Sequence, residues 1–325
     1  IIPVGESSLV PAVDGNDVTL TINSGLQWYA QNSLAARIRD TGAKSGTVVI
    51  MDAKNGNLLS VASYPTFDPN TDVGKKGAKL GNVAFSDVFE PGSTSKIMTI
   101  AAALEEGTVT PSTPVIIPNR LTRFDASFKD SHDHPTLYRT VAGTLAESSN
   151  IGTVLVSETM TSKTLESYFR KFGLGQRSGT GYPGEAKGLL SPSETWSGTQ
   201  AKTVAFGQGL SVTAIQAASV FQTIANGGVR VAPRLVESLT AADGTVTPTP
   251  RSATTRVVSE QTANDVSKML EGVVSGEGTA QEAMIPGYRV AGKTGTADYY
   301  DVAAKKYSGR TASFIGYAPA DDPQI

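Results

Sequence analysis

One segment, residues 93–107, constrains the fold of this chain more than any other. Its sequence, STSKIMTIAAALEEG, follows the structure-breaking pair Pro91 and Gly92 and is almost wholly apolar in its middle. A helix that is apolar on every side must be buried on every side, so this segment is predicted to be a central core helix. Ser93 and Lys96 lie at the N-terminal mouth of that helix, which is a surprising place for a hydroxyl and an amine.

Two β-hairpins and a large helical block are predicted around this helix. Residues 25–40 have helical periodicity, and the strand-like runs 46–52 and 58–64 are joined through an Asn-Gly pair. Further helical periods occur at 151–160, 163–173, 212–228 and 259–274. A second pair of strand-like runs follows at 288–297 and 311–320. This order predicts an α+β fold, in which the two hairpins form one antiparallel sheet flanked by helices and the helical block is inserted between them.

The composition excludes several classes of protein. The chain has 325 residues, a net charge of −2 and no cysteine. The near-neutral charge provides no electrostatic footprint for nucleic acid, and the lack of cysteine excludes disulfides, thiolate catalysis and cysteine zinc sites. No apolar run reaches the ~18 residues of a transmembrane helix. Because the chain starts at Ile1 rather than methionine, an upstream segment that carries a signal or a membrane anchor is expected.

The spacing of Ser93 and Lys96 suits nucleophilic catalysis. Positions i and i+3 share one face of a helix, so the lysine amine is predicted to reach the serine hydroxyl. A serine needs a base, and lysine is a base only when it is neutral. The positive end of the helix dipole and the neighbouring apolar side chains both favour a lowered pKa for Lys96. The alternative interpretation is a capping serine beside an ordinary lysine.

A second motif, ESSN at residues 147–150, lies on a tight turn between two helical runs. A hydroxyl on Ser148 could pass a proton there, and the amide of Asn150 could hold a peptide group. Taken alone, the stretch is an ordinary turn, because serine and asparagine are turn residues.

A third motif, AGKTGTA, lies inside a strand pattern. Gly295 in a strand indicates close approach by another backbone. In a regular strand Lys293 and Gly295 share one face while Thr294 and Thr296 share the other. A local twist, or backbone donors, must therefore bring Lys293 and Thr296 to one site. Taken alone, the stretch is an edge strand with a protective lysine.

In the order Ser-x-x-Lys, Ser-x-Asn and Lys-Thr-Gly, the three motifs match the set of penicillin-binding proteins and class A β-lactamases, with Ser-Ser-Asn in place of Ser-Asp-Asn. At these residues the chain resembles the class B penicillin-binding proteins, and more narrowly the septal, FtsI-type peptidoglycan D,D-transpeptidases of actinobacterium-like sources. The resemblance covers most of residues 17–325. It includes the stretches VTLTINSGLQ (18–27), ASYPTFDPN (62–70), FEPGSTSK (89–96), AESSNIG (146–152), FGLGQRSGTGYPGEAKGLL (172–190), FGQGLSVTAIQAASVFQTIANGG (206–228) and ASFIGYAPADDP (312–323).

The resemblance also implies a domain organisation. Residues 1–17 are expected to be the tail of an N-terminal pedestal domain, and residues 18–325 the transpeptidase, or penicillin-binding, domain. The family's membrane helix, pedestal, last strand and terminal helix are expected outside this sequence. The implied location is a single-pass anchor in the cell membrane with this domain outside the cytoplasm. The implied partners are peptidoglycan stem peptides ending in D-Ala-D-Ala, β-lactams, a SEDS-type glycosyltransferase and other divisome proteins, with no nucleic acid.

The family's mechanism is acyl transfer without a cofactor or a metal. By the resemblance, Ser93 attacks the stem peptide, Lys96 takes its proton, and Ser148 lies in the proton path to the leaving D-alanine. The implied substrate-binding residues are Asn150, Lys293, Thr294, Gly295 and Thr296. The backbone N–H groups of Ser93 and Thr296 are the implied oxyanion hole.

Several alternatives stay open at the level of sequence. A D,D-carboxypeptidase or β-lactamase could use the same motifs with a carboxylate such as Glu185 to activate water. A third possibility is a non-catalytic domain that senses β-lactams or serves as a scaffold. His132 and His134 are assigned to a surface loop near the cleft rather than to a metal site. Trp28 and Trp196 are assigned to packing.

Overall fold

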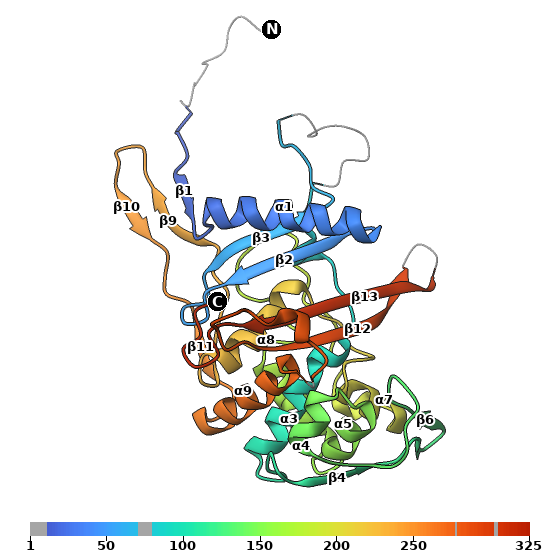
Figure 1. Cartoon of the computed structure of the whole chain (residues 1–325). Coiled ribbons are helices and arrows are strands. Elements are labelled where there is room, and N and C mark those ends of the chain that lie inside the picture. The colour runs from blue at the N-terminus through green and yellow to red at the C-terminus, as the bar shows by residue number, and fades with distance from the viewer. Residues whose placement is uncertain (1–11, 71–79, 277, 302–304) are drawn as a thin grey trace, which may run out of the picture.

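The computed structural model describes residues 12–70, 80–276, 278–301 and 305–325 (Figure 1). Most of the predicted N-terminal tail, residues 1–11, lies outside the described residues. The α-helices are α1 (Ser24–Thr41), α2 (Val83–Ser86), α3 (Lys96–Glu105), α4 (Val141–Ala146), α5 (Asn150–Ser157), α6 (Ser162–Lys171), α7 (Gly198–Ala205), α8 (Ala214–Ala225) and α9 (Glu260–Val274). The 3-10 turns are η1 (Gly92–Ser95), η2 (Ser193–Thr195) and η3 (Gln281–Ala283).

The strands are all paired antiparallel and most of them are short. They are β1 (Asp17–Leu20), β2 (Gly46–Met51), β3 (Leu58–Tyr64), β4 (Pro114–Ile117), β5 (Leu121–Arg123), β6 (Ala126–Phe128), β7 (Leu137–Thr140), β8 (Val229–Val231), β9 (Val236–Thr240), β10 (Val246–Pro248), β11 (Thr254–Arg256), β12 (Ala291–Asp301) and β13 (Lys306–Tyr317). The predicted hairpins are β2–β3 and β12–β13. The remaining strands were not predicted, because runs of three to five residues carry too little alternation to stand out.

Helix α1 covers the first hairpin and packs against β3 (Figure 1). It starts after the N-cap Asn23 and ends at Gly42, whose φ of 66° is left-handed, as expected for a stop signal. Its buried residues are Ala30, Leu34 and Ile38, at the spacing of one helical face. The packing prediction for Trp28 is wrong: this side chain lies off that face and is 69% exposed.

Helix α3 is the buried centre of the helical block, as predicted. Every residue from Lys96 to Ala103 is buried, and the helix packs against α5, α6 and α9. The segment nevertheless begins as the 3-10 turn η1, and only becomes α-helical at Lys96. Side chains three residues apart are eclipsed in a 3-10 turn, so Lys96 lies one tight turn beyond Ser93.

The second hairpin joins the helical block to the nucleophile turn. Strand β12 pairs with β13 in a regular register from Ala291–Tyr317 to Asp298–Arg310. It also packs against α9 and against η1 (Figure 1). The Lys-Thr-Gly motif therefore lies on a strand that contacts both α9 and the turn η1.

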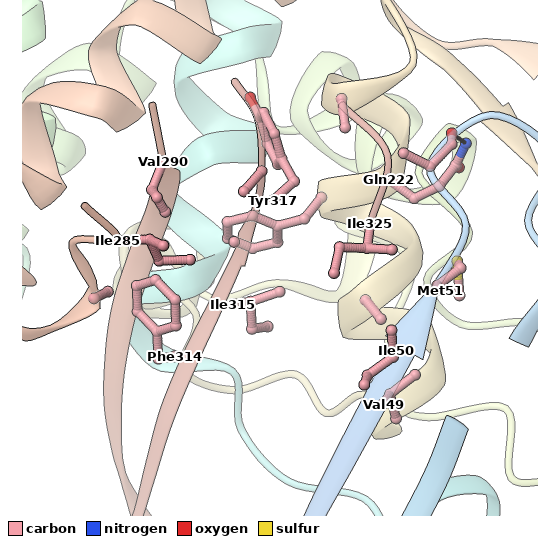
Figure 2. A pocket seen from close by; sticks show the side chains of 17 residues that line it. Val49, Ile50, Met51, Gln222, Ile285, Val290, Phe314, Ile315, Tyr317 and Ile325 are labelled. Atoms are coloured by element: carbon pink, nitrogen blue, oxygen red, sulfur yellow. Dashed lines mark hydrogen bonds between the residues drawn. The ribbon is translucent and has the colours of Figure 1, made fainter. Parts of the chain in front are cut away.

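An apolar groove separates the two hairpins. Among the described strands, β2 pairs with β3 and β12 with β13, and no ladder joins one hairpin to the other. Figure 2 shows the groove, which side chains of β2, β13 and α8 line together with Ile325. The α+β class and both antiparallel hairpins are confirmed, but the predicted continuous sheet is interrupted at this groove, since no described ladder joins β2–β3 to β12–β13.

Of the helices in the described residues, none combines the length and the apolar character needed to cross a membrane.

Candidate active site

Lys96 lies at the base of the site with its side chain fully buried. Its Nζ donates to Ser148 Oγ at 3.3 Å and also to the backbone oxygen of Ser148. Ser93 is half-buried in η1, and no hydrogen bond joins its Oγ to Lys96 Nζ in this structure. The direct contact predicted from the i, i+3 spacing is therefore not formed, because the lysine amine is turned toward Ser148. Hydrogen bonds between catalytic groups are commonly long without substrate and shorten when it binds.

Ser148 is the point at which the three motifs meet. Its hydroxyl receives a second hydrogen bond, 2.9 Å long, from Lys293 Nζ on β12. The residue has a φ of 61°, which is left-handed and uncommon for a non-glycine residue. Two lysines from distant parts of the chain thus converge on one hydroxyl that the backbone holds in a strained conformation.

The two lysines have different environments and therefore different pKa values. Burial holds the pKa of Lys96 well below its usual range, the positive charge of Lys293 lowers it further, and Asp130 acts in the opposite direction. Burial lowers the pKa of Lys293 to about 8. These shifts favour the neutral form of Lys96, which can accept a proton, while the ammonium form of Lys293 can bind an anion.

The Ser-Ser-Asn turn is anchored by an acid that the sequence analysis missed. Asp130 follows β6 and accepts hydrogen bonds from Ser149 Oγ at 2.8 Å and from the backbone N–H of Ile151 at 3.0 Å. It also accepts from the backbone N–H of Asn150. The Asn150 side-chain amide donates to the backbone oxygen of Lys129 at 3.0 Å. Asp130 lies in the polar loop KDSHDHP, in which the two histidines are more distinctive than the acid.

Strand β12 lies directly against the nucleophile turn because both carry glycines. A Cβ added to Gly295 would lie 2.9 Å from the backbone oxygen of Pro91, and one added to Gly92 would lie 2.7 Å from the backbone oxygen of Thr296. This is the close backbone approach that Gly295 predicted. In an antiparallel strand the N–H and C=O of one residue point to the same edge, so the Thr296 N–H also faces the turn of Ser93.

The alternation of side chains along β12 is regular through the motif. No bulge interrupts the register between Lys293 and Thr296. Lys293 and Gly295 are buried, whereas Thr294 is half-buried and Thr296 is exposed. The Thr294 hydroxyl lies 3.2 Å from the Thr279 hydroxyl. The exposed side chain of Thr296 leaves its hydroxyl accessible, in addition to its backbone N–H.

Residues 46–325 match the family model described as penicillin binding protein transpeptidase domain. The chain belongs to this family. It is 39% identical over 333 residues to penicillin-binding protein PbpB of Mycolicibacterium smegmatis, and the match covers 100% of this chain and 51% of that protein. It is 31% identical over 313 residues to a probable peptidoglycan D,D-transpeptidase, PenA, of Neisseria flavescens, covering 96% of this chain and 75% of that protein.

Solved structures give the same relationship. The penicillin-binding protein 3 of Mycobacterium tuberculosis in complex with aztreonam has a TM-score of 0.93 at 39% identity, covering 98% of this chain and 73% of that one. The complex of that protein with ampicillin superposes equally well, with a TM-score of 0.93. These relatives confirm the class B, PbpB/FtsI-like assignment and the fold class. The chain spans about half the length of the PbpB proteins that it matches, 51% and 49%.

The other residues singled out in the sequence do not belong to the three motifs of this penicillin-binding protein site. The Glu185 carboxylate is buried and accepts a hydrogen bond from the backbone N–H of Ser178 at 2.9 Å, so it braces its own loop. His132 is exposed as predicted, but the His134 side chain is only 6% exposed and contacts Asp130. Within the described ranges, no group of three or more His, Asp or Glu side chains could hold a metal ion. Trp196 packs against the core, as predicted.

Gly295→Ala is expected to lower the rate of acylation by a β-lactam about 10²-fold, because displacement of a reacting group by about 1 Å costs that much. The added Cβ would clash with the Pro91 backbone oxygen and, at 2.6 Å, with Ser313 Oγ, and so would push the nucleophile turn from β12. The measurement is the second-order rate constant with a fluorescent penicillin. Gly272→Ala on α9 is the control, since nothing lies within 4 Å of its added Cβ. A wild-type rate in Gly295→Ala would contradict the backbone contact.

Proposed function

We propose that this chain is a peptidoglycan D,D-transpeptidase domain that cross-links stem peptides through an acyl-enzyme on Ser93. The observation that carries the proposal is the convergence of Lys96 and Lys293 on Ser148 beside the turn of Ser93. Such a pair supplies a base and an anion-binding charge within one site. The names of the relatives, which include probable peptidoglycan D,D-transpeptidases, support the same reaction.

The first step forms the acyl-enzyme and releases D-alanine. Ser93 Oγ attacks the carbonyl carbon of the penultimate D-alanine while neutral Lys96 accepts the hydroxyl proton. The backbone N–H groups of Ser93 and Thr296 stabilise the oxyanion of the tetrahedral intermediate. When the intermediate collapses, the C–N bond breaks, and the proton held by Lys96 passes through the Ser148 hydroxyl to the leaving amine.

Substrate binding uses the free edge of β12. Because β12 pairs only with β13 among the described strands, its other edge can add the stem peptide as a further strand. The ammonium of Lys293 binds the terminal carboxylate by charge, together with hydroxyls of Thr294 and Thr296. Gly295 allows the strand to approach the nucleophile. Asn150 holds an amide of the peptide.

The second step is attack by an amine rather than by water. The amine of a second stem peptide forms a new C–N bond to the acyl carbon and loses a proton to Lys96. The ester C–O bond to Ser93 then breaks, and Ser93 Oγ takes that proton back from Lys96. The hydrolytic alternatives need a carboxylate that activates water. The candidate considered, Glu185, is engaged by Ser178 N–H and lies 3.4 Å from Thr180 Oγ1, which favours the transpeptidase.

A mass measurement tests the function. The purified chain is incubated with benzylpenicillin or with a D-Ala-D-Ala stem peptide, with and without an amine acceptor. A transpeptidase gives a long-lived penicillin adduct, releases D-alanine and forms a cross-linked product only with the acceptor. Rapid loss of the adduct would identify a β-lactamase, release of D-alanine without cross-linking a carboxypeptidase, and an adduct without peptide turnover a binding domain.

The acylation rate is expected to fall as pH rises through about 8, because Lys293 then loses the charge that binds the carboxylate. Lys293→Arg should move this fall above pH 10, since arginine stays protonated. The measurement is the second-order acylation rate from pH 6 to 10, with the exposed Lys306→Arg as the control. A fall near pH 8 that persists in Lys293→Arg would show that another group controls it.

The cellular setting follows from this chemistry. The proposed place is the outer face of the cell membrane, with a single-pass anchor and a pedestal before residue 18, because peptidoglycan is assembled there. Similarity to PbpB and to stage V sporulation protein D of Bacillus subtilis, at 33% identity, supports a class B enzyme. Septal wall synthesis with a SEDS-type glycosyltransferase and other divisome proteins is the proposed role. β-Lactams are proposed to acylate Ser93, as inhibitors that imitate the stem peptide.

A further inference from the structure

We propose that Asp130, in contact with His134, is a positioning residue that holds Ser148 in its left-handed conformation and tunes the base Lys96. This inference rests on the acyl-transfer function proposed above and adds two residues to that site. Neither belongs to the three sequence motifs.

The Asp130 carboxylate accepts most of the hydrogen bonds that the free donors at the N-terminus of α5 can make. Its Oδ1 accepts from the backbone N–H groups of Asn150 and Ile151, and its Oδ2 accepts from Ser149 Oγ. Ser149 is in turn the N-cap of α5 and accepts from Gly152 N–H at 2.8 Å. A carboxylate at a helix N-terminus interacts favourably with the free N–H groups and with the helix dipole. Asp130 therefore fixes the two residues that follow Ser148.

Ser148 needs such an anchor because its backbone is strained. A left-handed conformation is unfavourable for a non-glycine residue and persists only where its surroundings determine it. The φ of 61° at Ser148 turns its hydroxyl between Lys96 and Lys293. If the turn relaxed to an ordinary conformation, the hydroxyl would leave both amines. The bonds from Asp130 to the next residues oppose that relaxation.

His134 contacts this buried acid from its own loop. Asp130 is 8% exposed, and its Oδ2 lies 3.1 Å from His134 Nε2. The other ring nitrogen, Nδ1, lies 2.7 Å from the backbone oxygen of Pro135. The imidazole thus links the Asp130 carboxylate to the backbone of the loop that carries both residues.

The remaining charges around His134 are compensated or exposed. The neighbouring Asp133 is paired with Arg120 at 2.7 Å, and both are exposed. The ring of His132 lies 6.3 Å away, centroid to centroid, and Lys129 is exposed. Asp130 is consequently the buried charge with which His134 interacts.

Asp130 acts on Lys96 through space. Its charge raises the pKa of Lys96 against the lowering by burial and by Lys293. Asp130→Asn removes that charge, so more Lys96 is neutral at a given pH and the rising limb of the acylation profile moves to lower pH. His134→Gln keeps an amide donor for Asp130 and leaves the carboxylate in place, so the limb is expected to stay at the wild-type pH.

The experiment measures acylation by a fluorescent penicillin as a function of pH in the purified chain. The variants are Asp130→Asn, Asp130→Ala and His134→Gln, with the exposed Asp133→Asn as the control that makes the same chemical change nearby. Asparagine keeps the oxygen for Asn150 and Ile151 and can donate to His134 Nε2. Asp130→Asn is therefore expected to keep its plateau rate within about tenfold, whereas Asp130→Ala falls about 10²-fold.

A shift of the limb in Asp130→Asn, without one in His134→Gln, distinguishes positioning and tuning from a role in folding alone. The proposal is overturned if Asp130→Asn keeps the wild-type limb, or if Asp130→Ala acylates at the wild-type rate. If Asp130→Ala does not fold, the two conservative variants decide. A wild-type chain that forms no adduct at Ser93 would overturn the proposed function and this inference together. A wild-type adduct with unaltered variants would overturn this inference only.

Discussion

Ser93→Ala is expected to abolish the covalent adduct with penicillin, because it removes the hydroxyl proposed as the nucleophile. Ser93 lies in η1, with β12 packed against that turn, and Lys96 follows directly at the start of α3. The Ser148 hydroxyl is held between two lysines and lies outside that turn. Intact-mass analysis after incubation with a β-lactam, followed by peptide mapping, measures the outcome.

The same turn provides the control for this experiment. The Ser95 side chain is buried and its hydroxyl has no hydrogen-bond partner. Ser95→Ala removes a hydroxyl two residues from the nucleophile and should leave the adduct intact, with stability unchanged or increased because a buried unpaired polar group is costly. An adduct that persists in Ser93→Ala, or that maps to another residue, would refute the assignment of the nucleophile.

Lys96→Arg is expected to lower the acylation rate by about 10²–10⁴-fold, which is the usual contribution of a general base. Arginine keeps its proton at every accessible pH and cannot accept one from Ser93. The wild-type lysine can, because burial and the charge of Lys293 keep its pKa well below the usual range. The measurement is the second-order acylation rate at neutral pH and at pH 9, where arginine remains charged.

Lys163→Arg on the exposed face of α6 is the matched control, and it should acylate normally. Circular dichroism of Lys96→Arg would establish that the larger guanidinium has not unfolded the buried site. A folded Lys96→Arg variant with the wild-type rate would refute a neutral lysine base. The role would then pass to another group, and the convergence of the two lysines on Ser148 would need a different explanation.

Local signals predicted the elements that local forces determine. Asn23 and Ser259 cap their helices and Gly42 ends one, and each of these signals acts within one turn of its own helix. The buried character of α3 followed from its all-round apolar sequence. The glycine of the third motif indicated the backbone contact that Gly295 makes with Pro91.

Tertiary contacts decided what the sequence could not predict. The amine of Lys96 turns to Ser148, 52 residues later in the chain, rather than to Ser93, three residues earlier. Asp130 reaches Ser149 across 19 residues, and nothing in its local pattern distinguishes it from other loop acids. The two hairpins do not form one sheet, and side chains from distant parts of the chain line the groove between them.

The two lysines in the interior make the free energy of unfolding depend on pH. A lysine in an unfolded chain has a pKa of about 10.4, whereas Lys293 in the fold has one of about 8 and Lys96 is lowered well below its usual value. Between the folded and the unfolded values, the unfolded chain binds more protons than the native one. The free energy of unfolding, and with it the melting temperature, therefore increases as the pH becomes mildly alkaline and decreases as the pH falls. Lys96→Met would remove this pH-dependent loss of stability and give a more stable protein that lacks its base. The buried lysines therefore lower the free energy of unfolding, and packing in the rest of the core must compensate.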